Sequence, residues 1–162
     1  MRFLAAGLAL LVAQSIVPMA SPIDNLTLAD LHDSFGHVHN GHAHEAVDIM
    51  APLGTPVRAV VRGTFRKLFL SKPGGNTIYE FDEAREHSYY YAHLQRYADG
   101  LREGMRVERG DIIAYVGSTG NADPRAPHLH FAIFELGPSR EWWKGTPIDP
   151  YASLVAALRK SK

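Results

Sequence analysis

The sequence contains no cysteine. This absence excludes disulfide bonds, thiolate nucleophiles, iron–sulfur clusters, cysteine-ligated zinc and a cysteine-linked lipid anchor. Neither sign of charge is in excess, because 17 Lys and Arg side chains balance 17 Asp and Glu side chains. A chain with this balance offers no broad basic surface for a phosphate backbone, and we therefore expect no nucleic acid partner.

Long hydrophobic runs are also absent. The run from Phe3 to Ala13 has about half the length that a membrane-spanning helix requires. It follows the cation Arg2 and precedes small and polar residues, which is typical of a secretory signal peptide. We therefore expect residues 1–20 to be a signal peptide, with Ser15 and Ala20 as the two candidate cleavage points. An uncleaved anchor is the less favoured alternative.

The rest of the chain suits one compact domain. Residues 21–28 are expected to form a linker, and residues 29–162 a single domain without internal repeats. Export would bring this domain to the periplasm or outside the cell, with no membrane span in the mature chain.

Glycine and proline, with 14 and 10 residues, are somewhat more frequent than usual. They separate short runs rich in β-branched and aromatic residues, which favours strands joined by turns. The clearest strand candidates are Thr55–Val61, Thr64–Leu70, Asn76–Phe81, Ser88–His93, Ile112–Val116 and Leu129–Phe134. Only Tyr151–Lys160 has a clearly helical pattern. We therefore expect a mainly β domain built on antiparallel sheets, with a short C-terminal helix.

One of these strands carries a histidine with a predicted orientation. In the segment SYYYAHL, strict alternation places Tyr89, Tyr91 and His93 on one face of the strand. The same rule places Tyr90 and Ala92 on the opposite face.

The most informative pair of residues is His128 and His130. Residues two apart in a strand face the same side, so both imidazoles can line one cleft and share a metal ion. His44 and Asp48 add a nitrogen and an oxygen ligand. Two histidines and one carboxylate leave the fourth position of a tetrahedral zinc ion open to water, which indicates a catalytic metal. Spacing alone does not separate the two members of the H-x-H pair, since both ligate metal in some zinc enzymes.

Several motifs, taken in order, carry a resemblance to a known family. They are HEAVDIMAPLGTPVRAVVRGTF, GGNTIYEF, YYYAHL, LREGMRVERGDIIAYVGSTGNADPRAPHLHFAI and TPIDPY. Together they span about Leu31 to Leu154 and resemble the LytM and lysostaphin-like zinc metallopeptidases, which hydrolyse peptide bonds in bacterial peptidoglycan. The resemblance implies an open active-site groove on the sheet and a peptidoglycan peptide as the substrate, in the stem peptide or in a cross-link.

The resemblance also assigns roles to individual residues. Carried over by position, it implies that His44, Asp48 and His130 bind about one zinc ion per chain, and that His93 and His128 are the catalytic imidazoles. Bound zinc lowers the pKa of its water towards about 7 and polarises the scissile carbonyl. The two catalytic imidazoles would serve the proton transfers near neutral pH, with the general base being either of them.

One position departs from the family pattern. Ala46 stands where the family usually has glycine within H-x-G-x-D. Because glycine permits a positive φ or a close backbone approach, alanine is expected to tighten or slightly strain the ligand loop. Some relatives have lost zinc ligands and act as amidase activators, whereas every ligand position is filled here.

Two functions from other classes are the alternatives. A non-catalytic cell-wall-binding module, or an activator of a cell-wall amidase, would need a blocked or metal-free site despite the complete ligand set. A cupin-like metal oxygenase or binder is suggested by HLHFAIFE, in which Glu135 follows His130 by five positions. The second cupin motif is absent downstream, and the HEAVDI segment has no role in that scheme.

Other conspicuous side chains have less specific interpretations. Histidines outside the expected site are expected in exposed loops, with auxiliary zinc capture as the alternative: His32, His37, His39, His42 and His87. Trp142 and Trp143 either form a platform for a sugar or peptide or cover a sheet edge. Polar residues near the motifs are expected to have structural roles rather than substrate contacts: Asn76, Tyr91, Ser118 and Thr119.

Overall fold

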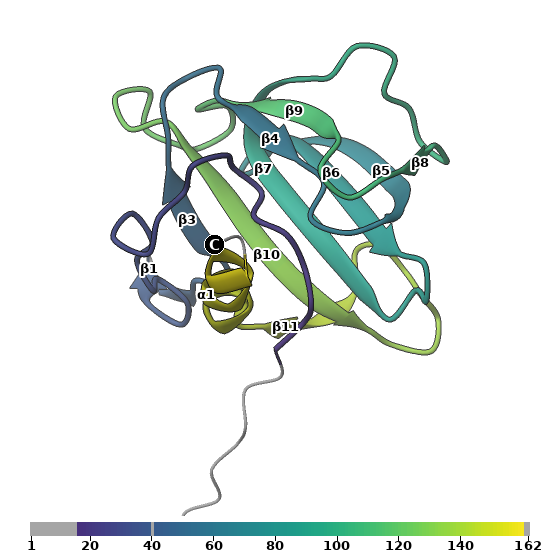
Figure 1. The fold of residues 1–162 in the computed structure, drawn as a ribbon. Helices are drawn as coiled ribbons and strands as arrows, with labels where there is room; N and C mark the ends of the chain where they lie inside the picture. The colour runs from purple at the N-terminus through teal and green to yellow at the C-terminus, as the bar shows by residue number, and fades with distance from the viewer. Residues whose placement is uncertain (1–15, 40, 161–162) are drawn as a thin grey trace, which may run out of the picture.

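The fold is mainly β with one C-terminal helix, as the sequence predicts. A computed structural model describes residues 16–39 and 41–160 (Figure 1), so most of the expected signal peptide lies outside the described residues. The strands are β1 (Val38–His39), β2 (His42–Ala43), β3 (Val47–Met50), β4 (Pro56–Arg58), β5 (Gly63–Ser71), β6 (Gly75–Asp82), β7 (His87–Tyr97), β8 (Arg106–Val107), β9 (Ile112–Val116), β10 (His128–Leu136) and β11 (Gly145–Ile148). The helix is α1 (Pro150–Lys160).

Nine of these strands form one antiparallel sheet. Its main path has the order β11-β10-β7-β6-β5-β8, while β3 pairs with β10 and β9 links β7 to β4. β1 and β2 form a separate hairpin shortly before β3. β10 is therefore central, because it pairs with β7, β3 and β11.

Alternation along β3 and β10 separates the core from the functional face. In β3, Val47 and Ile49 are fully buried while Asp48 between them is half-buried. In β10, Leu129 is fully buried, and the histidines on either side of it remain partly exposed. The apolar side chains pack into the core, and the polar side chains of both strands therefore share the opposite face.

Helix α1 and the segment of residues 16–31 lie against the same face of the sheet (Figure 1). Within that segment Val17, Met19 and Ile23 are buried in the core. The backbone N–H of Val17 donates to Ser153 Oγ of α1 at 2.9 Å. This segment is thus packed on the domain, including part of the range that the sequence assigns to the leader and linker.

The helix has the start and end that its sequence favours. Pro150 occupies the first helical position, and Asp149 Oδ1 accepts a hydrogen bond from the N–H of Tyr151 at 2.9 Å. Arg159 and Lys160 lie in the last turn, where cations stabilise the helix dipole. In the described part of the chain, no helix is long and apolar enough to cross a membrane.

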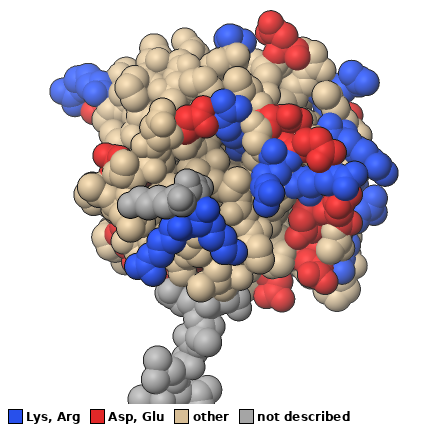
Figure 2. Space-filling view, in the orientation of Figure 1, with Lys and Arg blue, Asp and Glu red and all other residues tan. Residues whose placement is uncertain are grey.

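In Figure 2 acidic and basic side chains are intermixed, mainly on the right of the view, and much of the remaining surface is uncharged. Arg58 lies 2.7 Å from Asp24, and Lys67 lies 2.8 Å from Glu103. Such exposed pairs contribute little stability each. This view shows no broad patch of one sign, in agreement with the balanced composition.

A carboxyl group lies inside the core at Glu80, in the middle of β6. Its side chain is fully buried, and its Oε2 accepts a hydrogen bond from the Tyr91 hydroxyl at 2.6 Å. The Tyr91 hydroxyl in turn accepts from the backbone N–H of Val60 at 3.1 Å. Burial raises the pKa of Glu80 to about 8, partly offset by the Tyr91 hydrogen bond. Glu80 is therefore mostly protonated at neutral pH.

This raised pKa predicts a pH-dependent stability. Between the ordinary value of 4.5 and about 8, folded Glu80 holds a proton that the unfolded chain releases, so stability falls as pH rises through that window. Glu80→Gln is expected to remove up to about 4 kcal/mol of this pH dependence, since each pKa unit corresponds to about 1.4 kcal/mol. Urea unfolding at pH 5 and pH 8 measures it. Glu135→Gln, at an exposed position, should leave the pH dependence in place; an equal effect of both substitutions would contradict the prediction.

Candidate metal centre

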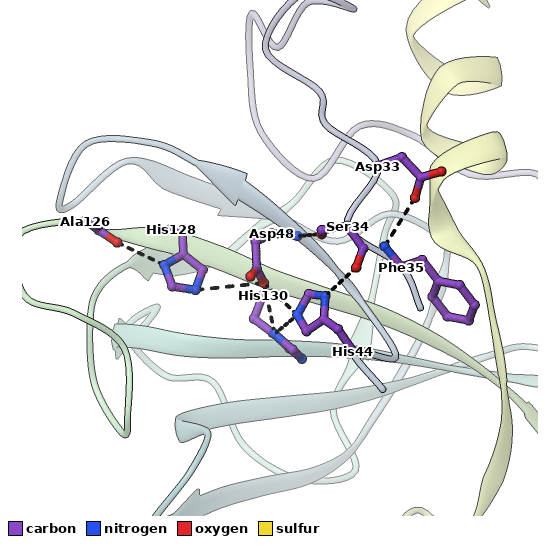
Figure 3. A network of polar contacts seen from close by, with 8 residues as sticks. All are labelled: Asp33, Ser34, Phe35, His44, Asp48, Ala126, His128 and His130. Carbon is purple, nitrogen blue, oxygen red and sulfur yellow. Dashed lines mark hydrogen bonds and ion pairs between the residues drawn. The ribbon is translucent and has the colours of Figure 1, made fainter. Parts of the chain in front are cut away.

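Three side chains that could hold a metal ion, His44, Asp48 and His130, converge where β3 runs beside β10 (Figure 3). Asp48 Oδ1 lies 3.0 Å from His130 Nδ1 and 3.2 Å from His44 Nε2, and the two nitrogens are 3.2 Å apart. In a tetrahedral zinc site with bonds of about 2.0–2.1 Å, neighbouring ligand atoms are about 3.3 Å apart. The triangle therefore fits one face of a zinc tetrahedron. It is the one group of three or more such side chains among the described residues.

The strand register brings these residues together. Asp48 of β3 lies directly opposite His130 of β10 in the antiparallel ladder. Side chains at opposed positions lie on the same face and within contact distance. His44 precedes β3 and reaches the same point, with its ring centroid 4.9 Å from that of His130. Residues more than 80 positions apart in sequence thus form one centre.

Ser34 supports this centre from the segment that precedes β1, and the sequence analysis did not find it. Its carbonyl oxygen lies 3.0 Å from His44 Nδ1, and its Oγ accepts a hydrogen bond from the backbone N–H of Asp48 at 3.1 Å. Because a carbonyl only accepts, His44 Nδ1 carries the proton and Nε2 presents its lone pair to the triangle. A single serine at this distance in sequence has no pattern that would have revealed it.

His93 and His128 adjoin the triangle without belonging to it. Their ring centroids are 4.9 Å apart, and His93 lies 5.5 Å from the ring of His130. His93 Nδ1 donates to the carbonyl of Thr119 at 2.8 Å, and His128 Nδ1 donates to the carbonyl of Ala126 at 2.9 Å. Both imidazoles therefore carry a proton on Nδ1 and direct Nε2 away from that carbonyl, and His128 Nε2 lies 3.8 Å from Asp48 Oδ1.

The predicted facing of His93 is wrong. Tyr91 is buried in the core, whereas His93 lines the cleft together with Tyr90 and Ala92. The reason is local: His93 has a φ of +59°. The register of β7 shifts across His93 in its pairing with β6, and again just after it, between Leu94 and Arg96, in its pairing with β9. A left-handed residue interrupts the alternation of a strand. The N–H of His93 donates to the carbonyl of Gly74 at 2.8 Å, which helps to hold this strained backbone.

Burial and hydrogen bonds set the charges of the centre. Burial raises the pKa of Asp48, but the hydrogen bond to His130 and the neighbouring imidazoles outweigh it, and the pKa ends below its usual value. Burial lowers the pKa of His93 to about 4, although the Thr119 hydrogen bond opposes the change. Near neutral pH the centre therefore contains an ionised carboxylate beside a neutral imidazole that can accept a proton.

All five predicted site residues line one open cleft of about 570 Å³. His42 lines it too; this residue is exposed, as predicted, but lies in the short strand β2 rather than in a loop. His32 and His37 are exposed, as predicted. His87 is not in an exposed loop: it is half-buried at the start of β7, where its Nδ1 lies 2.9 Å from Asp82 Oδ2. The described histidines outside the site form no second metal-binding group.

The polar residues near the motifs have structural contacts. Asn76 Nδ2 donates to the carbonyls of Leu94 and Gln95, and Thr119 Oγ1 donates to the carbonyl of Leu94. These bonds hold the segment that contains His93. Ala46 is fully buried and has no positive φ, so alanine fits the ligand loop without backbone strain.

The fold and the centre define a class: a metal-dependent hydrolase site on an antiparallel sheet. Residues 42–150 match the model of Peptidase family M23. The chain is 34% identical over 118 residues to the L-Ala–D-Glu endopeptidase of Bacillus subtilis, covering 70% of this chain and 35% of that protein. It is 32% identical over 125 residues to the peptidoglycan DD-endopeptidase ShyC of Vibrio cholerae, covering 74% and 27%.

Solved structures agree with the sequence matches. The catalytic domain of the antimicrobial peptidase lysostaphin from Staphylococcus simulans superposes with a TM-score of 0.63 at 32% identity, covering 77% of this chain and 89% of that domain. The chain belongs to peptidase family M23. It spans about a fifth to a third of the length of the curated relatives it matches. Family membership and the fitting ligand triangle confirm the expected resemblance and the expected zinc cofactor.

Proposed function

We propose that this domain is a zinc metalloendopeptidase that hydrolyses peptide bonds in bacterial peptidoglycan. The observation that carries the proposal is the triangle of His44, Asp48 and His130, with ligand atoms 3.0–3.2 Å apart beside two further imidazoles. Relatives named as endopeptidases of L-Ala–D-Glu and DD bonds support the reaction class. Zinc held there would supply an acidified water and a Lewis acid for the scissile carbonyl.

The chain's own groups supply the proton transfers. In this proposal, His44, Asp48 and His130 are the zinc ligands, and the ionised carboxylate contributes the one negative charge among them. His93 and His128 present Nε2 to the same cleft, each held by a backbone carbonyl on Nδ1. A fixed neutral imidazole accepts a proton at Nε2, and its protonated form donates to a developing oxyanion or leaving amine.

Removal of the metal tests this function. A chelator such as 1,10-phenanthroline is expected to abolish hydrolysis of purified peptidoglycan. Added zinc is expected to restore it, because the three proposed ligands lie within 3.2 Å of one another in the fold. Release of new amino groups measures the rate. Hydrolysis that persists in the chelator would point to another mechanism. A zinc-loaded protein that hydrolyses nothing would instead favour an amidase activator or a binding module.

We also propose that the chain is exported and that cleavage follows Ser15. A cut at that point keeps Val17 and Met19, which are buried in the core, whereas a cut after Ala20 removes both. N-terminal sequencing of protein recovered from the cell envelope is expected to begin at Ile16. A start at Ser21 would refute the cleavage point, and an intact Met1 on cytoplasmic protein would refute export.

A further inference from the structure

A row of aromatic rings leads away from the metal centre. The ring of Tyr90 lies 6.0 Å from that of His130, Tyr79 lies 4.6 Å from Tyr90, and Trp142 lies 4.9 Å from Tyr79. At the far end Trp142 contacts both Trp143 at 5.3 Å and Phe69 at 5.4 Å. The aromatic row thus consists of Tyr90, Tyr79, Trp142, Trp143 and Phe69. It begins inside the cleft, because Tyr90 is part of its wall.

The far end of the aromatic row is open to solvent. The Trp143 side chain is 63% exposed and Phe69 is 40% exposed. Lys67 lies at the rim, with its Nζ 6.0 Å from the Trp142 ring and paired with Glu103 at 2.8 Å. Burying this aromatic surface would contribute to stability, so contiguous exposure beside a cleft indicates a ligand-binding surface.

The strands that carry Tyr79 and Tyr90 offer no free edge to a peptide at these two residues. Tyr79 of β6 is paired with β5 and β7, and Tyr90 of β7 is paired with β6 and β10. A peptide that adds a strand to a sheet needs the free main-chain groups of an edge strand, which Tyr79 and Tyr90 do not offer. A ligand above these central strands instead meets aromatic side chains, with the Lys67–Glu103 pair at the rim. Sugar rings suit such a surface, because their C–H faces pack on the negative face of an aromatic ring and their hydroxyls remain solvated.

We propose that the aromatic row binds sugar rings of the peptidoglycan glycan strand while the attached peptide occupies the cleft. This inference rests on the proposed function and extends it from the scissile peptide to the glycan. Binding energy from a part of the substrate that does not react can position the part that does.

Intrinsic fluorescence tests the site directly. The chain has two tryptophans, Trp142 and Trp143, and both belong to the aromatic row. Titration of the zinc-loaded full chain with peptide-free glycan strands is expected to change tryptophan emission in a saturable manner. A sugar-free cross-linked peptide is expected to leave the emission unchanged. A response to the peptide alone, or to neither ligand, would overturn the proposal.

Variants provide a second test with its own control. Trp143→Ala is expected to lower kcat/KM for a glycan-bearing muropeptide about tenfold relative to kcat/KM for the sugar-free peptide. Phe69→Ala should lower the same ratio, whereas Leu70→Ala should not. Leu70 is the next residue of β5, is 72% exposed, and faces the other side of the strand.

The outcomes separate this proposal from the proposed function. Equal losses on both substrates, or an unchanged ratio in Trp143→Ala and Phe69→Ala, would refute sugar binding by the row. If the unsubstituted protein hydrolyses neither substrate, the peptidase function fails, and the fluorescence titration with glycan strands still decides whether the row binds sugars.

Discussion

Replacing His44, Asp48 or His130 by alanine is expected to remove zinc and hydrolytic activity together. Only two protein ligands would remain in each variant. Ser34, which supports the centre through hydrogen bonds, cannot replace the missing ligand. Because even changes outside the ligand set cost about tenfold to a hundredfold in metal affinity, loss of a ligand should cost more than a hundredfold. Zinc content by mass spectrometry after gel filtration, with hydrolysis assayed on the same sample, measures both effects.

A matched control accompanies these variants. His32→Ala removes an exposed imidazole outside the cleft and is expected to retain zinc and activity. Circular dichroism should show the same β content in all four variants, because the ligands lie on the open face rather than in the core. A ligand variant that keeps full zinc content would contradict its assignment, whatever its activity.

Replacing His93 or His128 by alanine is expected to separate metal binding from turnover. Neither nitrogen belongs to the ligand triangle, so zinc should stay bound. Turnover should fall by about a hundredfold to ten-thousandfold, corresponding to roughly 3 to 5 kcal/mol of barrier, as for a lost general acid or base. Zinc content and single-turnover rates on a defined muropeptide measure the two quantities independently.

Comparing variants of the two histidines in the H-x-H pair offers the outcome that would contradict this prediction most clearly. If His128→Ala loses zinc while His130→Ala retains it, the roles of the two histidines are reversed in this chain. The hydrolase function would survive that result, because the cleft would still hold two histidines and a carboxylate. If His128→Ala and His130→Ala both keep zinc and full turnover, the metal centre itself is misassigned.

Local patterns predicted the strands and the facing of the H-x-H pair. The period of two in HLHF directs Leu129 into the core and leaves both histidines in the cleft. The helix at the C-terminus was equally readable from its apolar spacing and its final basic residues. The short strand Val47–Met50 was missed, because four residues carry too little pattern to separate a strand from a loop.

Long-range features were not predictable from one sequence. The register that sets Asp48 opposite His130 joins segments more than 80 residues apart. The left-handed backbone of His93 is held by a hydrogen bond to Gly74, and its ring by one to Thr119, both in other segments of the chain. The alternation of residues along a strand contains no information about a left-handed residue. It therefore predicted the wrong face of the strand for His93. The family resemblance supplied its role where the pattern did not.

The products formed from a defined cross-linked muropeptide provide the most direct test of the central claim. The zinc-loaded protein is incubated with the muropeptide, and the products are identified by mass spectrometry. The account predicts two fragments whose summed mass exceeds that of the substrate by one water, with the break at a peptide bond and the glycan intact. Cleavage at the bond between sugar and peptide or between sugars, or an unchanged substrate, would contradict it.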